Sequence, residues 1–407
     1  MTNDGRLRLA TIAMLLLTGV LAGTQLGKIA PLVDWYRNEA GFSLVLIGWL
    51  TSMISIFVAL VALPTGWAIE RMGMRRSFAA SALVMAGGGL ALAFLAEPWA
   101  ILAARLVEGI GYLVLVIVIP ALLNSIAPPA WRAPALAMWG GFVPVGFAVA
   151  DFMARGVLPT AGPQYFLLAA IIVFAVCALL AAILLGKVDD HDPDAGAPAA
   201  QVLQGGIAGQ ITFPVVLVAL SFGFYVVLSV SFFAFMPAFV ASPQANILLS
   251  AGLIALIVPV GNVLTGVLVK GRDGRFVLML AGIGLAASLI AAIPAFGVSG
   301  SVLATVAAVV LAIAGGMIAS ALFACIPAIV PQGKSVSIAI GLVCQMGGIG
   351  TVIGPPMAGY VIETYGWSGF GVFLALTAAL GGICLLPLAR RRVQPMETAY
   401  AGNNTAG

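Results

Sequence analysis

Charged residues are the scarcest class in this chain of 407 residues. Asp, Glu, Lys and Arg together make up 8% of it, whereas a typical soluble protein has about a quarter of its residues charged. Hydrophobic residues reach 62%, and the mean hydropathy is +1.16. A soluble domain of this size could not cover such a surface with polar groups. The composition therefore excludes an ordinary soluble protein and indicates a polytopic membrane protein.

Residues that bind metals or form disulfides are also rare. The four cysteines lie in apolar runs without a CxxC spacing, and the one histidine, His191, lies in an acidic loop. Outside that loop the sequence contains no His/Asp/Glu cluster, and it has no nucleophile motif or GxxxxGK[ST] phosphate loop. These absences argue against catalytic residues, a metal, a cofactor and a pump driven by nucleotide hydrolysis. The net charge of +4 is spread over loops, so nucleic acid is not an expected partner.

Long apolar runs dominate what is present. Each is long enough for a helix to cross about 30 Å of hydrocarbon at 1.5 Å per residue. We place twelve spans at residues 9–33, 43–69, 77–96, 99–126, 134–157, 164–187, 212–240, 247–269, 276–297, 301–330, 336–362 and 367–388. Strands of a membrane barrel would instead alternate in polarity over about ten residues. The sequence therefore predicts an all-α polytopic fold.

Lys and Arg are distributed unevenly between the loops that join these spans. They concentrate at the termini and in the even-numbered loops, whereas the odd-numbered loops hold Arg37 and Arg155. By the positive-inside rule we expect both termini on the cytoplasmic side of the cytoplasmic (inner) membrane. An even number of spans follows, in agreement with twelve.

The chain divides near its midpoint. Residues 188–210 are acidic and then rich in Ala, Gly, Pro and Gln, which predicts a flexible cytoplasmic linker. It separates a six-helix bundle at 1–187 from a second at 211–393, and we expect a disordered cytoplasmic tail at 394–407. The loop after the second span has a weaker copy after the eighth span, at 266–275. Two six-span halves with a repeated loop indicate the pseudo-symmetric fold of a transporter.

The loop between the second and third spans carries the most specific motif. Its glycines and charged residues are Gly66, Glu70, Arg71, Gly73, Arg75 and Arg76. This pattern resembles GxxxDRxGRR, the signature of the major facilitator superfamily, with Glu70 in place of Asp. In that family the charges of this loop hold the two halves in one conformation. The resemblance therefore implies a gating role for this loop and for Arg272 and Arg275 in its copy. The alternative is that these charges only orient the chain in the membrane.

Two further stretches resemble motifs of the same superfamily. Arg105 to Gly111, in the fourth span, is similar to RxxxGxG, and the eleventh span resembles GxxxGPxxGG. The matching residues of the eleventh span are Gly350, Gly354, Pro355 and Gly359. Small residues let helices approach closely, so we expect these four to serve helix packing. The fifth span, where drug antiporters usually carry this motif, has a degraded copy, which argues mildly against drug efflux. The first and eleventh spans are similar to those of cyanate-transporter-like and organic-anion porters.

Four charged residues fall well inside the predicted spans, away from the span ends, namely Lys28, Arg105, Glu108 and Asp151. A lone charge in hydrocarbon is costly, so it is normally paired or faces a water-filled path. Arg105 and Glu108 share a helix face and can pair. We expect Lys28, supported by Arg105, to neutralise an anionic substrate, and Asp151 or Glu108 to carry a coupling proton. The alternatives are that Lys28 extends to lipid headgroups and that the Arg105–Glu108 pair only makes insertion tolerable.

The second half offers only neutral polar groups for a substrate. The candidates are Tyr225, Ser229 and Gln345. One cationic and one weakly polar side suit a small monoanion, such as a monocarboxylate. We therefore predict a monomeric secondary active transporter of a small organic or inorganic anion, coupled to a proton or another ion. Proton-driven efflux of apolar compounds is the alternative, and a membrane enzyme or sensor is disfavoured by the missing motifs and short tails.

Overall fold

The computed structural model describes residues 3–128, 131, 135–136, 138–188, 207–245, 247–297, 300–331, 334 and 336–389. Of these residues, 88% are helical and none forms a strand. Most of the predicted linker at 188–210, and the whole predicted tail at 394–407, lie outside the described residues. The all-helical prediction is confirmed.

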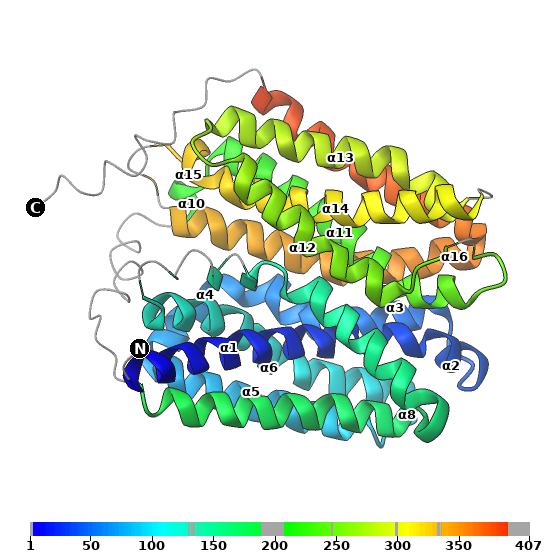
Figure 1. Cartoon of the computed structure of the whole chain (residues 1–407), viewed down its shortest axis with the longest axis horizontal. Helices are drawn as coiled ribbons and strands as arrows, with labels where there is room; N and C mark the ends of the chain where they lie inside the picture. The colour runs from blue at the N-terminus through cyan, green and yellow to red at the C-terminus, as the bar shows by residue number, and fades with distance from the viewer. Residues whose placement is uncertain are drawn as a thin grey trace, which may run out of the picture.

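The helices form two layers, each built from one half of the chain (Figure 1). The first layer contains α1 (Asn3–Gly27), η1 (Ala30–Leu32), α2 (Val33–Asn38), α3 (Leu44–Ser52), η2 (Met53–Ser55), α4 (Ile56–Met72), α5 (Met74–Leu92), α6 (Pro98–Ile126) and α8 (Phe142–Leu185). The second contains α10 (Ile207–Gln210), α11 (Phe213–Ala241), α12 (Ala251–Leu268), α13 (Gly274–Phe296), α14 (Ser301–Ala324), α15 (Ile326–Ile329) and α16 (Val336–Ala389). The exact bundle boundaries at 1–187 and 211–393 stay a prediction.

The layers meet mainly where α16 packs against α3 and α4 and where α12 packs against α8. The start of α1 and the end of α16 lie towards the same end of the molecule, which we call the near end (Figure 1). The opposite end, which holds α2, is called the far end (Figure 1).

Two helices are too long for a single crossing, because α8 has 44 residues and α16 has 54. Each contains one residue with non-helical dihedral angles, Gly162 with φ +83° and Gly366 with φ +67°. Glycine adopts positive φ without the steric cost of a Cβ atom. Figure 1 shows α8 turning back on itself at the far end. A single glycine thus joins two antiparallel arms in each helix, between the predicted fifth and sixth spans and between the eleventh and twelfth.

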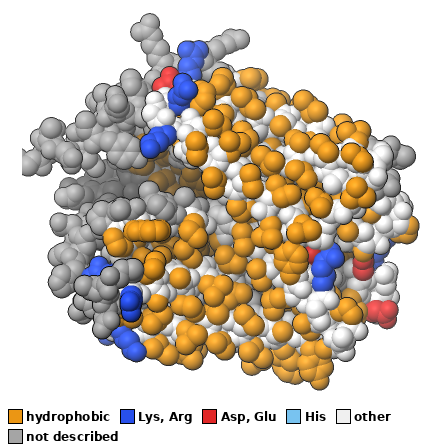
Figure 2. All heavy atoms as spheres, viewed as in Figure 1, with side chains coloured by type: hydrophobic (Ala, Val, Ile, Leu, Met, Phe, Trp, Pro, Cys, Tyr) orange, Lys and Arg blue, Asp and Glu red, His pale blue; other side chains and the backbone are white. Residues whose placement is uncertain are grey.

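The surface agrees with a membrane location. Nine helical segments of the described chain are long and apolar enough to cross a bilayer, with α8 and the α16 segment Ile338–Leu388 counted once each. Figure 2 shows hydrophobic side chains over most of the visible face, with Lys, Arg, Asp and Glu towards its two ends. The chain is a multi-pass membrane protein, whereas the count of twelve spans stays a prediction.

Candidate binding and coupling site

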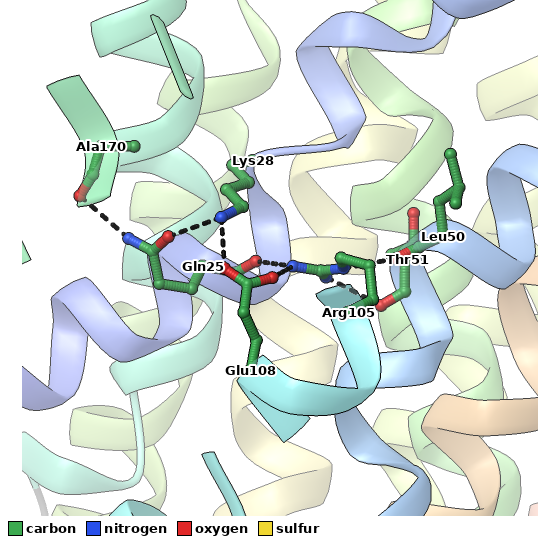
Figure 3. A network of polar contacts seen from close by, with 7 residues as sticks. All are labelled: Gln25, Lys28, Leu50, Thr51, Arg105, Glu108 and Ala170. Atoms are coloured by element: carbon green, nitrogen blue, oxygen red, sulfur yellow. Dashed lines mark hydrogen bonds and ion pairs between the residues drawn. The ribbon is translucent and has the colours of Figure 1, made fainter. Parts of the chain in front are cut away.

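Lys28 directly follows α1 and its side chain is fully buried. Its Nζ atom donates a hydrogen bond to Glu108 Oε1 at 2.5 Å and another to Gln25 Oε1 at 2.9 Å (Figure 3). The side chain therefore points into the first half of the protein, away from any lipid headgroup. Glu108 comes from α6, so this ion pair connects two helices that are distant in the sequence.

Arg105 also binds Glu108, and it satisfies three backbone carbonyl groups as well. Its Nη1 atom donates to Glu108 Oε2 at 2.6 Å and to the carbonyl of Gln25 at 2.8 Å. Its Nε and Nη2 atoms donate to the carbonyls of Leu50 at 2.7 Å and Thr51 at 3.4 Å (Figure 3). α1 ends at Gly27 and α3 ends at Ser52, so the three carbonyls lie in the last turns of these two helices. Carbonyls in the last turn of a helix lack an N–H donor from a following turn, and Arg105 supplies one.

Glu108 thus lies between two cations, and α5 leaves room for it. A Cβ atom added to Gly89 would lie 2.7 Å from Glu108 Oε1, and one added to Gly88 would lie 2.9 Å from Glu108 Cγ. The glycine pair of α5 therefore allows the carboxylate to sit at the contact between α5 and α6. A side chain at either position would displace the carboxylate from Lys28 and Arg105.

Gln25 also belongs to this cluster, and a search of the sequence for charged residues missed it. Its Nε2 atom donates to the carbonyl of Ala170 in α8 at 3.0 Å, while its Oε1 atom accepts from Lys28 (Figure 3). A polar residue three positions before a buried lysine shares its helix face, and this spacing was the available signal. The charge cluster of Gln25, Lys28, Arg105 and Glu108 therefore ties together α1, α3, α6 and α8.

The charge cluster carries two cations and one carboxylate. In the described part of the chain, no further acidic side chain bonds to Lys28 or Arg105. With all three groups ionised, the cluster has one positive charge in excess. Burying an uncompensated charge is expensive, so this excess favours an anion in the vicinity.

Asp151 does not belong to this cluster. It lies on the first arm of α8, where its Oδ2 atom accepts from Arg155 Nε at 2.8 Å and from the backbone N–H of Gly252 at 3.0 Å. Together with Asp34, it also lines a cavity at the far end. The structure therefore pairs Lys28 with Glu108 rather than with Asp151.

The candidates of the second half lie in α11 and α16. Tyr225 is buried and Ser229 is half-buried, one turn further along α11. Gln345 Nε2 donates to the carbonyl of Ala59 in α4 at 3.0 Å. Gln345 therefore bridges the two halves, and its role in binding substrate stays a prediction.

The residues of the predicted gating loop lie at the near end. Arg75 donates to the carbonyl of Val188, which follows α8. Gly73 separates α4 from α5, and Arg71, Arg76 and Arg275 are exposed. The Arg272 guanidinium lies 5.0 Å from the ring centre of Phe276. Gly66 lies in α4, as does Glu70, whose side chain is outside the described part of the structure. The gating role stays a prediction.

The small residues of the eleventh span lie at close helix contacts. A Cβ atom added to Gly350 would lie 2.5 Å from the carbonyl oxygen of Gly223 in α11, and one added to Gly354 would lie 2.9 Å from Ser231 Oγ. On the other face, a Cβ atom on Gly359 would lie 2.3 Å from the Leu44 carbonyl oxygen in α3. Pro355 packs beside Gly48 of α3 in the same way. These contacts support the packing prediction, both within the second half and between halves.

Comparisons with known proteins agree with this architecture. The sequence is similar to the arabinose-proton symporters of Escherichia coli strains K12 and O157:H7, with 27% identity over 132 residues in each case. This match covers 32% of the chain and only 28% of each symporter.

Two similar solved structures come from a bacterial homolog to the human lysosomal transporter Spinster, both in an inward-facing conformation. The unoccupied form has a TM-score of 0.73 and 18% identity, covering 94% of this chain and 95% of the other. The occupied form has a TM-score of 0.70 and 17% identity, covering 98% and 97%. This likeness concerns the fold. Residues 15–342, well over half of the chain, also match the family model of the Major Facilitator Superfamily. The chain therefore belongs to the major facilitator superfamily of membrane transporters.

Proposed function

We propose that the protein is a secondary active transporter that moves a small anion, such as a monocarboxylate, across the cytoplasmic membrane. The two halves would rock around a central site, with both termini in the cytoplasm. The observation that carries this proposal is the excess positive charge of the buried cluster at Lys28, Arg105 and Glu108. A monoanion beside Lys28 would supply an anionic partner for one of the two cations.

The contacts of Lys28 also suggest how a proton is coupled. The ammonium is shared between the Glu108 carboxylate and the neutral Gln25 amide. A proton on Glu108 would remove the ion pair, leaving Lys28 held by Gln25 and available to an anion. One proton and one monoanion entering together leave the charge of the cluster unchanged. This arithmetic favours symport of one proton with each monoanion.

Two further points support proton coupling through Glu108. The partly matching relatives are named arabinose-proton symporters, so a related sequence uses a proton gradient. Glu108 contacts both cations, whereas Asp151 bonds to Arg155 and to a backbone N–H of the other half. Arabinose itself is a weak candidate for this chain, because a polyhydroxylated sugar requires more amides and carboxylates than the cluster offers.

Uptake into proteoliposomes tests the anion site. We expect Lys28→Ala to abolish uptake of the anion and Lys28→Arg to reduce it strongly, because guanidinium geometry differs from that of an ammonium. Lys187→Ala, which removes an exposed positive charge two residues after α8, is the matched control and should transport at the wild-type rate. Wild-type uptake by both Lys28 variants would refute the anion site.

A thermal-shift screen identifies the substrate class. Purified protein is heated with small anions at several pH values, and a ligand that binds the folded state raises the melting temperature as its concentration increases. We expect monoanions to stabilise the wild-type protein and not Lys28→Ala. Stabilisation by cationic or neutral apolar compounds alone would instead support efflux of such compounds.

A further inference from the structure

Two carboxylates at the far end each bind the start of a helix in the opposite half. Asp151 of α8 accepts a hydrogen bond from the backbone N–H of Gly252, the second residue of α12, at 3.0 Å. Glu363 of α16 accepts one from the backbone N–H of Leu44, the first residue of α3, at 2.5 Å. Both bonds therefore cross from one half of the protein to the other.

The two helix starts are built alike. Ser43 precedes α3 and accepts a hydrogen bond from the N–H of Leu46 at 3.1 Å. Ser250 precedes α12 and accepts one from the N–H of Leu253 at 3.2 Å. The two serines are separated by nearly the same number of residues as the two carboxylates. The internal repeat has thus placed the same device at both contacts between the halves.

A carboxylate at a helix start is a favourable arrangement. The first N–H groups of a helix lack intrahelical acceptors, and the helix dipole places a partial positive charge there. Hydrogen bonds to an ionised acceptor are stronger than those between neutral groups. In both helices the serine accepts from the N–H of the third helical residue. The carboxylate of the other half accepts from the first residue of α3 and from the second residue of α12.

The backbones approach closely where these carboxylates bind. A Cβ atom added to Gly252 would lie 2.8 Å from Asp151 Oδ2, and one added to Gly359 would lie 2.3 Å from the Leu44 carbonyl oxygen. Towards the near end, the nearest atom to a Cβ on Gly141 would be Asn262 Nδ2, at 3.5 Å. The contact between α8 and α12 is thus tighter at its far end than at its near end.

We propose that Asp151 and Glu363 form a latch that holds the far end of the protein closed. The latch consists of the Asp151–Gly252 and Glu363–Leu44 hydrogen bonds. It rests on the proposed function in one respect, since it requires halves that rock apart. Each opening of the far end breaks both bonds, because each partner moves with a different half. The latch therefore sets the ratio of far-end-closed to far-end-open protein.

Distances between spin labels in substrate-free protein test the latch. Asn38 and Gln244 lie in different halves and line one far-end cavity, so both are replaced by cysteine in a background without the native cysteines. We expect a short distance in the otherwise wild-type protein. Asp151→Ala and Glu363→Ala should each raise the far-end-open fraction roughly two- to five-fold, and the double variant should multiply the two effects.

The control is Glu97→Ala. Glu97 is also a carboxylate just before a helix, α6, but it is exposed and caps no N–H group there, so its removal should leave the distances unchanged. If gel filtration shows that the alanine double variant is aggregated, Asp151→Asn combined with Glu363→Gln replaces it. These substitutions keep the side-chain shapes and remove the charges, and they should raise the far-end-open fraction by less. Wild-type distances in the folded double variant would refute the latch. The spin-label experiment uses no substrate, so its outcome does not depend on the anion site. If the Lys28 variants transport normally while Asp151→Ala and Glu363→Ala still open the far end, only the substrate proposal is refuted.

Discussion

Replacing Glu108 should destabilise the protein far more than replacing Lys28. Glu108→Gln leaves Lys28 and Arg105 buried together with no counter-charge, because Glu108 is bonded to both of them. Lys28→Met instead leaves a neutral Arg105–Glu108 pair and removes the charge that is in excess. The two substitutions each delete one partner of the same 2.5 Å ion pair, yet they leave very different charges behind.

The expected magnitudes follow from these residual charges. Removing one partner of a buried ion pair costs about 3–5 kcal/mol, and we expect Glu108→Gln to reach at least this range because two cations lose their partner. Lys28→Met leaves the Gln25 Oε1 atom without its donor, which lowers the free energy of unfolding by about 1–3 kcal/mol. The same substitution removes the cost of burying an ammonium, which offsets part of this loss. We therefore expect a net cost below about 2 kcal/mol for Lys28→Met.

The assay is equilibrium unfolding by sodium dodecyl sulfate in mixed micelles, which yields a free energy of unfolding for each variant. Lys28→Met combined with Glu108→Gln should be more stable than Glu108→Gln alone, because one of the two stranded cations is gone. Glu97→Gln at the exposed start of α6 is the control for loss of a carboxylate. Equal costs for the two single variants, or additive costs in the double variant, would refute the charge cluster as described.

Three further predictions concern the same contacts. Arg105→Lys should lower the free energy of unfolding by about 2–5 kcal/mol in the same assay, because an ammonium cannot serve the three carbonyls and the carboxylate that the guanidinium binds; a stability equal to wild type would contradict these bonds. Wild-type uptake should accelerate as the external pH falls, because the proton is a co-substrate in the proposed symport, whereas any uptake by Glu108→Gln should not respond to pH; a retained response would place the proton elsewhere. Gly359→Ala should favour the far-end-open form in spin-label distances, because its Cβ atom would lie 2.3 Å from the Leu44 carbonyl oxygen, whereas Gly382→Ala, with no atom within 4 Å, should behave as wild type.

The sequence was sufficient for the helical fold and for part of the cluster. Long apolar runs specify helices because hydrocarbon leaves the backbone no other partner, and a charge within such a run is conspicuous. The Arg105–Glu108 pair could be predicted because its members are three residues apart on one helix. The Lys28–Glu108 pair could not, because 80 positions and several helices separate its members. Only packing brings α1 and α6 together.

The residues that were missed share a physical reason. Gln25 is uncharged, so the cost of burying a charge does not single it out, although it organises Lys28 and Arg105. Glu363 follows the predicted eleventh span and would count as a loop residue, whereas the structure continues the helix past it. Its role depends on the start of α3 in the other half, which no local pattern reveals.

The single-glycine turns at Gly162 and Gly366 have a consequence for how the chain is made and handled. With one residue between the two arms of α8 and of α16, we expect each pair of arms to enter the bilayer together as a helical hairpin. The same tight corners offer a protease or an antibody no protruding segment. An epitope tag inserted at either glycine would force two helices apart and should block surface display of the protein.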